Sequence, residues 1–165
     1  MITKQIEFNI PEDKEVQSAL GVLVVRHGHL EYLLRLTVKS LLQLPIHEAL
    51  TQTNKKGVKA LREKIEKEAK ERLRQGIALD NLLDFLKRSW EASDKRNIFV
   101  HNVWANERGG PLMIQNDDFS WSRPPSSREI EDLSRKIQTI THELNKDRKN
   151  GDLSEALKNL SLNAE

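Results

Sequence analysis

The sequence predicts an all-α protein, an up-and-down helical bundle with a small β-hairpin inserted before its last helix. Two observations carry this prediction: apolar residues recur at helical spacing along most of the chain, and turns rich in glycine, proline and asparagine separate these stretches. The 165 residues suffice for one domain with a single core. We expect that domain at residues 1–148, followed by a polar C-terminal tail at 149–165.

The first helix is predicted to begin at residues 11–13, Pro-Glu-Asp, because proline fits a first turn and acidic side chains suit the positive end of a helix. It should end near Leu44, ahead of Pro45. Two largely apolar stripes run along it. They consist of Leu20, Val24, His27, Glu31, Leu34, Val38 and Leu41, and of Val22, Val25, His29, Leu33 and Leu36. One stripe is enough to cover a small core, so the second predicts a partner subunit.

The middle of the chain predicts further helices. After a short turn of helix at 46–53 and a break at 54–57, an amphipathic helix begins at Val58. Its charged face is either solvated, with i,i+4 ion pairs, or a basic ridge that helps to hold RNA. The next apolar stripe consists of Leu79, Leu82, Leu83, Leu86 and Trp90 and continues through Asn97, His101 and Trp104. Ser93 or Asp94 could cap a new helix at this point, so one helix and two helices both fit.

Residues 109–111, Gly-Gly-Pro, end the helical pattern. The segments 112–114 and 119–121 flank a turn-rich Asn-Asp-Asp and predict a hairpin between this helix and the last one. Ser126 and Glu129 then have the spacing of a capping box. The last long helix follows, with Ile130, Leu133, Ile137, Ile140 and Leu144 on one face. A weaker apolar pattern in the tail indicates a frayed or partner-dependent segment.

Composition leaves the function open. With 37% hydrophobic and 32% charged residues, the chain has the composition of an ordinary soluble globular protein. It contains neither a run of 18 apolar residues nor a signal-peptide core, so we expect no membrane association. The absence of cysteine removes disulfides and thiolate zinc sites and fits the cytoplasm. The formal charge of +2 is too small for a protein that coats duplexes, so a phosphate would be bound by a few placed side chains.

One group of residues carries candidate chemistry. His101 lies on the apolar stripe of its helix, Asn97 lies one turn earlier, and the long side chain of Arg96 can reach the same edge. Cleavage of RNA by its own 2′-hydroxyl needs a base and an acid that titrate near neutrality, which suits histidine. It also needs a group that binds the phosphate oxygens, which suits arginine. The alternative is structural, with a core histidine, a helix cap and a solvated charge.

The segment Arg-Asn-Ile-Phe-Val-His at 96–101 resembles the motif of the HEPN family, an arginine, then a polar residue, then a histidine after a short spacer. The resemblance implies a helical bundle that dimerises and brings two motifs into one cleft. It also implies metal-independent endoribonuclease activity, with Arg96 and His101 catalytic and Asn97 orienting or polarising them. Arg135 and His142 have a spacing within the family's range, but Lys136 follows that arginine, and we interpret the pair as chance.

Three further residues are candidates for substrate binding: His27, Glu31 and Trp104. His27 and Glu31 are four apart and share a helix face, so they form a local pair unless Arg96 is the cation that the carboxylate needs. Trp104 could stack on a base, although a place in the core is the commoner fate of tryptophan. Because residues two apart on a helix diverge, His27 and His29 are not expected to bind a metal. We expect neither a metal nor a cofactor.

Three interpretations of function follow. The first is a homodimeric, metal-independent endoribonuclease that cleaves single-stranded or loop RNA, as a toxin or defence effector. The second is a catalytically inactive HEPN dimer that acts as a scaffold or as a nucleotide- or RNA-binding module, which the weak basic bias favours. The third keeps the first chemistry but adds an antitoxin protein as a partner that silences it.

Overall fold

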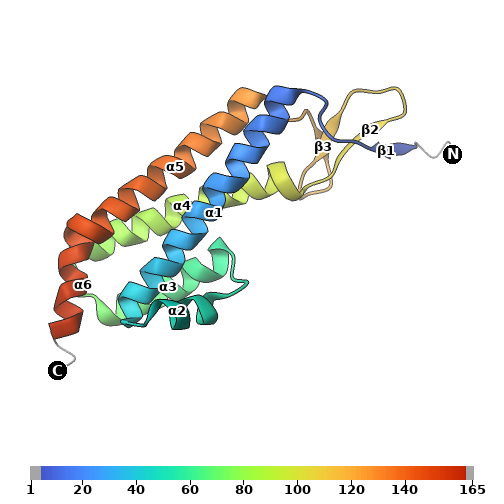
Figure 1. Ribbon diagram of the computed structural model, residues 1–165. Coiled ribbons are helices and arrows are strands. Elements are labelled where there is room, and N and C mark those ends of the chain that lie inside the picture. The colour runs from blue at the N-terminus through green and yellow to red at the C-terminus, as the bar shows by residue number, and fades with distance from the viewer. Residues whose placement is uncertain (1–4, 163–165) are drawn as a thin grey trace.

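The computed structural model describes residues 5–162, which form a helical bundle with a small antiparallel sheet at one end (Figure 1). The helices are α1 (Lys14–Leu42), α2 (Ile46–Thr53), α3 (Val58–Arg72), α4 (Ile77–His101), α5 (Ser127–Asn150) and α6 (Asp152–Leu162). The strands are β1 (Ile6–Phe8), β2 (Trp104–Glu107), β3 (Met113–Gln115) and β4 (Trp121–Ser122). The predicted helical bundle is confirmed in outline, whereas the sheet is larger than the predicted hairpin. No helix within these residues is both long and apolar enough to cross a membrane.

Local signals explain where α1 begins and ends. The Asp13 side chain accepts hydrogen bonds from the backbone amides of Glu15 and Val16 at 2.8 and 3.4 Å, and thereby caps the first turn. Gln43 adopts the left-handed conformation, with φ of 55°, and ends the helix two residues before Pro45. The predicted limits of this helix therefore agree with the structure to within a few residues.

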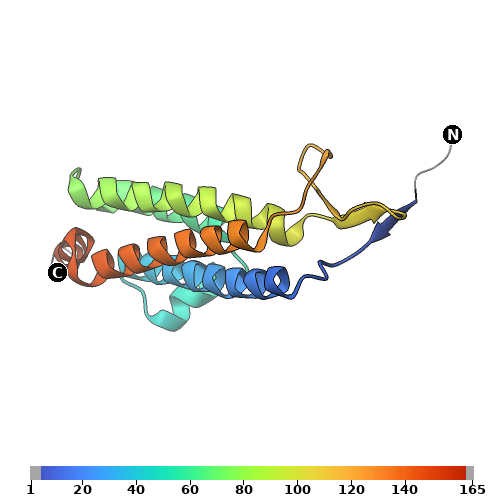
Figure 2. The same ribbon diagram turned by 90° about the horizontal axis from the view of Figure 1, so that it is seen from above.

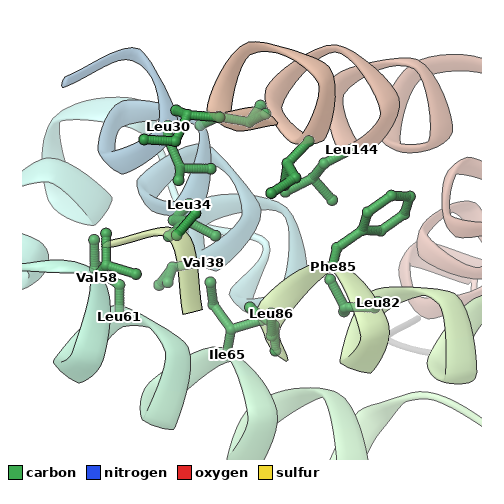
Figure 3. Close-up of a cluster of buried hydrophobic side chains, with 14 of the residues drawn as sticks. Leu30, Leu34, Val38, Val58, Leu61, Ile65, Leu82, Phe85, Leu86 and Leu144 are labelled. Atoms are coloured by element: carbon green, nitrogen blue, oxygen red, sulfur yellow. The ribbon is translucent and has the colours of Figure 1, made fainter. Parts of the chain in front are cut away.

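The bundle encloses one apolar core to which α1, α3, α4, α5 and α6 contribute. In Figure 3, Leu34 of α1, Leu61 of α3 and Leu86 of α4 converge, and at most 2% of each is exposed. Full burial of one such side chain stabilises the fold by about 1.5–3 kcal/mol. The predicted face of α5 is buried at all five positions, and a capping box formed by Ser126 and Glu129 fixes the start of that helix.

A single continuous helix, α4, carries the motif. Ser93 starts no new helix because its hydroxyl lies 2.8 Å from Nε2 of His27 on α1 instead of capping a backbone amide. The helix ends at His101, so the apolar stripe stops there and Trp104 lies in β2. The Asn102 side-chain amide donates to the Gln115 carbonyl at 2.8 Å and ties the end of the helix to β3.

The sheet has the strand order β1-β2-β3-β4, with antiparallel neighbours, and projects beyond the end of the bundle (Figures 1 and 2). Its β3–β4 hairpin is the predicted one, shifted by one or two residues. Trp104 in β2 was expected to continue the helical stripe, whereas β1 lies within residues 1–10, which were expected to be extended or irregular. The two pair over a long sequence separation, with Phe8 opposite Ala105.

The expected polar tail contains a helix. Within 149–165, α6 packs against α4 and α5, and Leu153 and Leu157 are 0% and 8% exposed. The weak apolar pattern in this segment therefore marks a face of the core rather than a frayed end. Residues 163–165 lie outside the described part of the chain.

Candidate functional site

The motif residues occupy the last two turns of α4, next to the sheet (Figure 1). Arg96 and Asn97 are half-buried, and His101 is exposed. Nη1 of Arg96 donates to Oδ1 of Asn97 at 3.1 Å and contacts Nε2 of His101 at 2.7 Å. The three side chains predicted to share one small volume do so, although a catalytic role for them stays a prediction.

The contact between Arg96 and His101 constrains the hydrogen-bonding role of the imidazole. A guanidinium only donates hydrogen bonds and keeps its protons in proteins. Nε2 of His101 is therefore placed as the acceptor in this contact. A neutral imidazole with a lone pair on Nε2 is the form that can take a proton from a hydroxyl.

One donor of the Arg96 guanidinium is unpaired among the described residues. Its Nε is buried without a hydrogen-bond partner. Burial lowers the pKa of Arg96, and the nearby Glu31 carboxylate acts in the opposite direction. A partly desolvated guanidinium beside an exposed histidine is suited to bind a phosphate.

His27 lies behind the motif and not on its surface. Only 5% of it is exposed, and its Nε2 lies 2.8 Å from the Ser93 hydroxyl. Burial, followed by the charges of Arg96 and His101, lowers the pKa of His27 from 6.5 to about 4. It is therefore neutral near pH 7, and a buried neutral ring cannot touch a substrate directly.

Ser93, His27 and Glu31 have the order of groups found in a serine hydrolase triad. The Glu31 carboxylate lies 4.0 Å from Nδ1 of His27, on the side of the ring opposite Ser93. A nucleophile must reach its substrate, however, and Ser93 is 3% exposed. We interpret these three residues as a support for the motif. Sequence reasoning did not assign Ser93 this role, and the only signal for it is its place one turn before Asn97 on α4.

Trp104 is half-buried, and its indole Nε1 donates to the Phe99 carbonyl at 3.1 Å. The ring packs against the core next to the end of α4. This contact anchors β2 to the motif helix. Base stacking by Trp104 stays a prediction that its remaining exposed surface permits.

Among residues 5–162 no group of three or more His, Asp or Glu side chains is arranged to hold a metal ion. The candidate site thus consists of Arg96, Asn97 and His101, with buried His27 against Ser93 of the same helix and Glu31 next to His27. No protein-family model, no curated protein and no solved structure matches this chain.

Proposed function

We propose that the protein is a metal-independent endoribonuclease of HEPN type that cleaves RNA by transesterification. The observation that supports it best is the 2.7 Å contact between Nη1 of Arg96 and Nε2 of the exposed His101. It puts a group that can bind phosphate and an imidazole that can act as a base side by side.

In the proposed reaction the phosphate attracts the guanidinium of Arg96 away from Nε2 of His101. The freed nitrogen takes the proton of the 2′-hydroxyl, and the 2′-oxygen attacks phosphorus. The bond from phosphorus to the 5′-oxygen breaks, and that oxygen takes a proton from an acid. The products carry 2′,3′-cyclic phosphate and 5′-hydroxyl ends, and no step needs a metal. Such an attack needs a backbone that can rotate, which favours single-stranded or loop RNA.

We infer that two copies of the chain build this site, so that a second His101, in its protonated form, supplies the acid. The exposed valines of α1 support a second copy, since Val22, Val24 and Val25 are 45%, 42% and 58% exposed. Gly21 and Gly28 lie on the same helix, with no atom near the place of a Cβ. The exposed valines make this face apolar, and the two glycines leave room on it for another helix to approach closely.

The test is cleavage of a mixed RNA pool in EDTA by the wild type, His101→Ala and the control His142→Ala. We expect His101→Ala to cleave about 10²–10⁴-fold more slowly, because it removes the general base, and His142→Ala to match the wild type. Equal cleavage by all three proteins, or cleavage that requires a divalent metal, would overturn the mechanism. Binding of RNA without cleavage by the wild type would favour the inactive module instead.

A further inference from the structure

The β3–β4 hairpin carries two exposed aromatic side chains near the motif. Phe119 in its loop and Trp121 on β4 are 79% and 37% exposed. In Figure 2 the segment that joins β3 to α5 projects from the bundle. We propose that Phe119 is a stacking platform for an unpaired base of the RNA whose phosphate is bound at the motif. This inference deepens the proposed function and rests on it for the identity of the ligand.

Hydrogen bonds attach the hairpin loop to the end of the motif helix. Asn102 directly follows His101, and its side-chain amide donates to the Gln115 carbonyl at 2.8 Å. The same amide donates to Oδ1 of Asp117 at 3.2 Å. Phe119 lies two residues beyond Asp117, and two residues span at most about 7 Å. A base next to a phosphate bound at the motif is therefore the part of the RNA that can meet this ring.

Phe119 occupies a loop position that glycine normally fills. The Asn116 amide donates to the Ser120 carbonyl at 2.8 Å, and the Phe119 amide donates to the Asn116 carbonyl at 3.0 Å. These bonds close a three-residue loop, whose last residue is usually a left-handed glycine. Phe119 has a φ of 64°, which a bulky side chain adopts only at a cost in free energy. The phenylalanine is therefore not explained by the turn that contains it.

Side chains of the loop hold this backbone in place and leave the ring exposed. Nδ2 of Asn116 donates to the Ser120 hydroxyl at 2.9 Å. The amide and the hydroxyl of Ser120 both donate to Oδ1 of Asp118, at 3.0 and 2.6 Å. A strained residue that its surroundings hold in place, with an exposed apolar ring, is typical of a residue that contacts a ligand.

The surroundings of the ring favour a nucleobase over a protein partner. Apart from Phe119, residues 116–120 are all polar, so the exposed apolar surface of this hairpin is limited to Phe119 and Trp121. A stable protein interface covers about 800 Å² on each partner, far more than two side chains offer. A flat ring with a polar rim instead matches a base, which has an apolar face and polar edges. The carboxylates of Asp117 and Asp118 repel phosphates, so the base and not the backbone of the RNA should face the loop.

Replacement of Phe119 by glycine should have opposite effects on RNA binding and on stability. Phe119→Gly should weaken the binding of single-stranded RNA at least about fivefold, because a base loses its stacking partner. It should leave the Tm unchanged or raise it by up to about 3 °C, because glycine adopts the left-handed conformation without strain. A merely structural role for Phe119 would lower the Tm and the RNA affinity together.

The binding probe is a short single-stranded RNA with 2′-fluoro groups, which lacks the proposed nucleophile and is therefore not cleaved. Fluorescence anisotropy measures its affinity for the full chain as the wild type, Phe119→Gly and the control Phe8→Gly. Phe8 is 80% exposed on β1, so the control removes an equally exposed ring elsewhere on the sheet and should bind within about twofold of the wild type. Phe119→Trp keeps an aromatic ring and should bind at least as tightly as the wild type.

Two further measurements tie the loss of affinity to a stacked base. Abasic sites introduced one at a time into the probe should include one that weakens binding to the wild type as much as Phe119→Gly does. The same abasic site should not weaken binding to Phe119→Gly any further. Should Phe119→Gly fail to fold, Phe119→Asn takes its place, because asparagine also tolerates a positive φ.

Unchanged RNA affinity in Phe119→Gly, an equal loss in Phe8→Gly, or a loss accompanied by a lower Tm would overturn the proposal. So would a wild type that does not bind the probe, an affinity that no abasic site changes, or a loss of self-association in place of RNA affinity. If the probe binds as expected but the wild type cleaves no unmodified RNA, the proposed catalysis fails while the base site stands. Cleavage with no role for Phe119 would have the reverse meaning.

Discussion

Two arginine–histidine pairs on helices have a spacing in the range of the HEPN motif, Arg96 with His101 and Arg135 with His142, and among the described contacts only the first pair touches. Arg135 and His142 lie on the same face of α5, but two turns, or about 10 Å, separate them along the axis. Arg135 is held by Glu131 and Asp132, the residues four and three positions before it. Arg96 has Ala92 and Ser93 at the equivalent positions. Without a carboxylate in the preceding turn, its guanidinium turns forward to His101.

This difference shows that spacing alone does not define the motif. A spacing of seven positions places His142 on the same helix face as Arg135. The carboxylates around Arg135, however, occupy the donors of its guanidinium. Five positions place His101 off that face, but a long side chain at the end of a helix can bridge the offset. The residues that precede the arginine decide whether it is available.

The largest expected difference between the two pairs is in catalysis. Arg96→Ala should slow RNA cleavage by at least about 10²-fold, because it removes the group that stabilises charge on the phosphate. Arg135→Ala should leave the rate within about twofold of the wild type, since its guanidinium is bound to surface carboxylates. Single-turnover rates on one RNA substrate measure both. A similar loss of cleavage rate in the two variants would show that the two arginines do not differ in catalysis.

The next effect is on stability, and it separates buried His27 from exposed His142. The unfolded chain takes up a proton at His27 near pH 6.5, but the native ring does so only near pH 4. The free energy of unfolding should therefore decrease as the pH falls through this window, by up to about 3 kcal/mol. Urea unfolding at pH 7 and pH 4.5 measures the decrease. His27→Gln should make this decrease in the free energy of unfolding smaller, and His142→Gln should leave it unchanged. An equal decrease in both variants would show that His27 does not titrate in this way.

The smallest effect concerns the ion pairs of Arg135. All three side chains are more than half exposed, at 57%, 53% and 60% for Arg135, Glu131 and Asp132. Arg135→Ala should therefore change the free energy of unfolding by less than about 1 kcal/mol, because exposed pairs contribute little. Thermal unfolding checks this, and a loss of several kcal/mol would mean that α5 depends on these contacts.

Much of the helical fold follows from local sequence signals. The cap of α1 at Asp13, the capping box at Ser126 and the buried face of α5 all lie in short segments whose residues interact with one another. The sheet could not be derived in this way. Its β1–β2 pairing joins residues about a hundred positions apart, and Trp104 happens to continue the helical spacing of α4 into a strand.

The candidate site was predictable in part for the same reason. Arg96, Asn97 and His101 lie within two turns of one helix, so their proximity follows from helical geometry. The contact of His27 with Ser93 depends on how α1 packs on α4, and the place of Glu31 beside Gly57, the N-cap of α3, depends on how α1 packs on α3. A serine within a helix pattern can cap a helix end, face solvent or bind a distant side chain. The local sequence does not distinguish these three roles.

The central claim is that the 2′-hydroxyl of RNA is the nucleophile at the Arg96–His101 site. The most direct measurement compares an RNA oligonucleotide with the same chain carrying 2′-deoxyribose at the cleaved position, in EDTA, with product ends identified by mass spectrometry. We predict cleavage of the RNA to 2′,3′-cyclic phosphate and 5′-hydroxyl ends and no cleavage at the deoxy linkage. Cleavage at the deoxy linkage, or products with 3′-hydroxyl ends, would contradict the account.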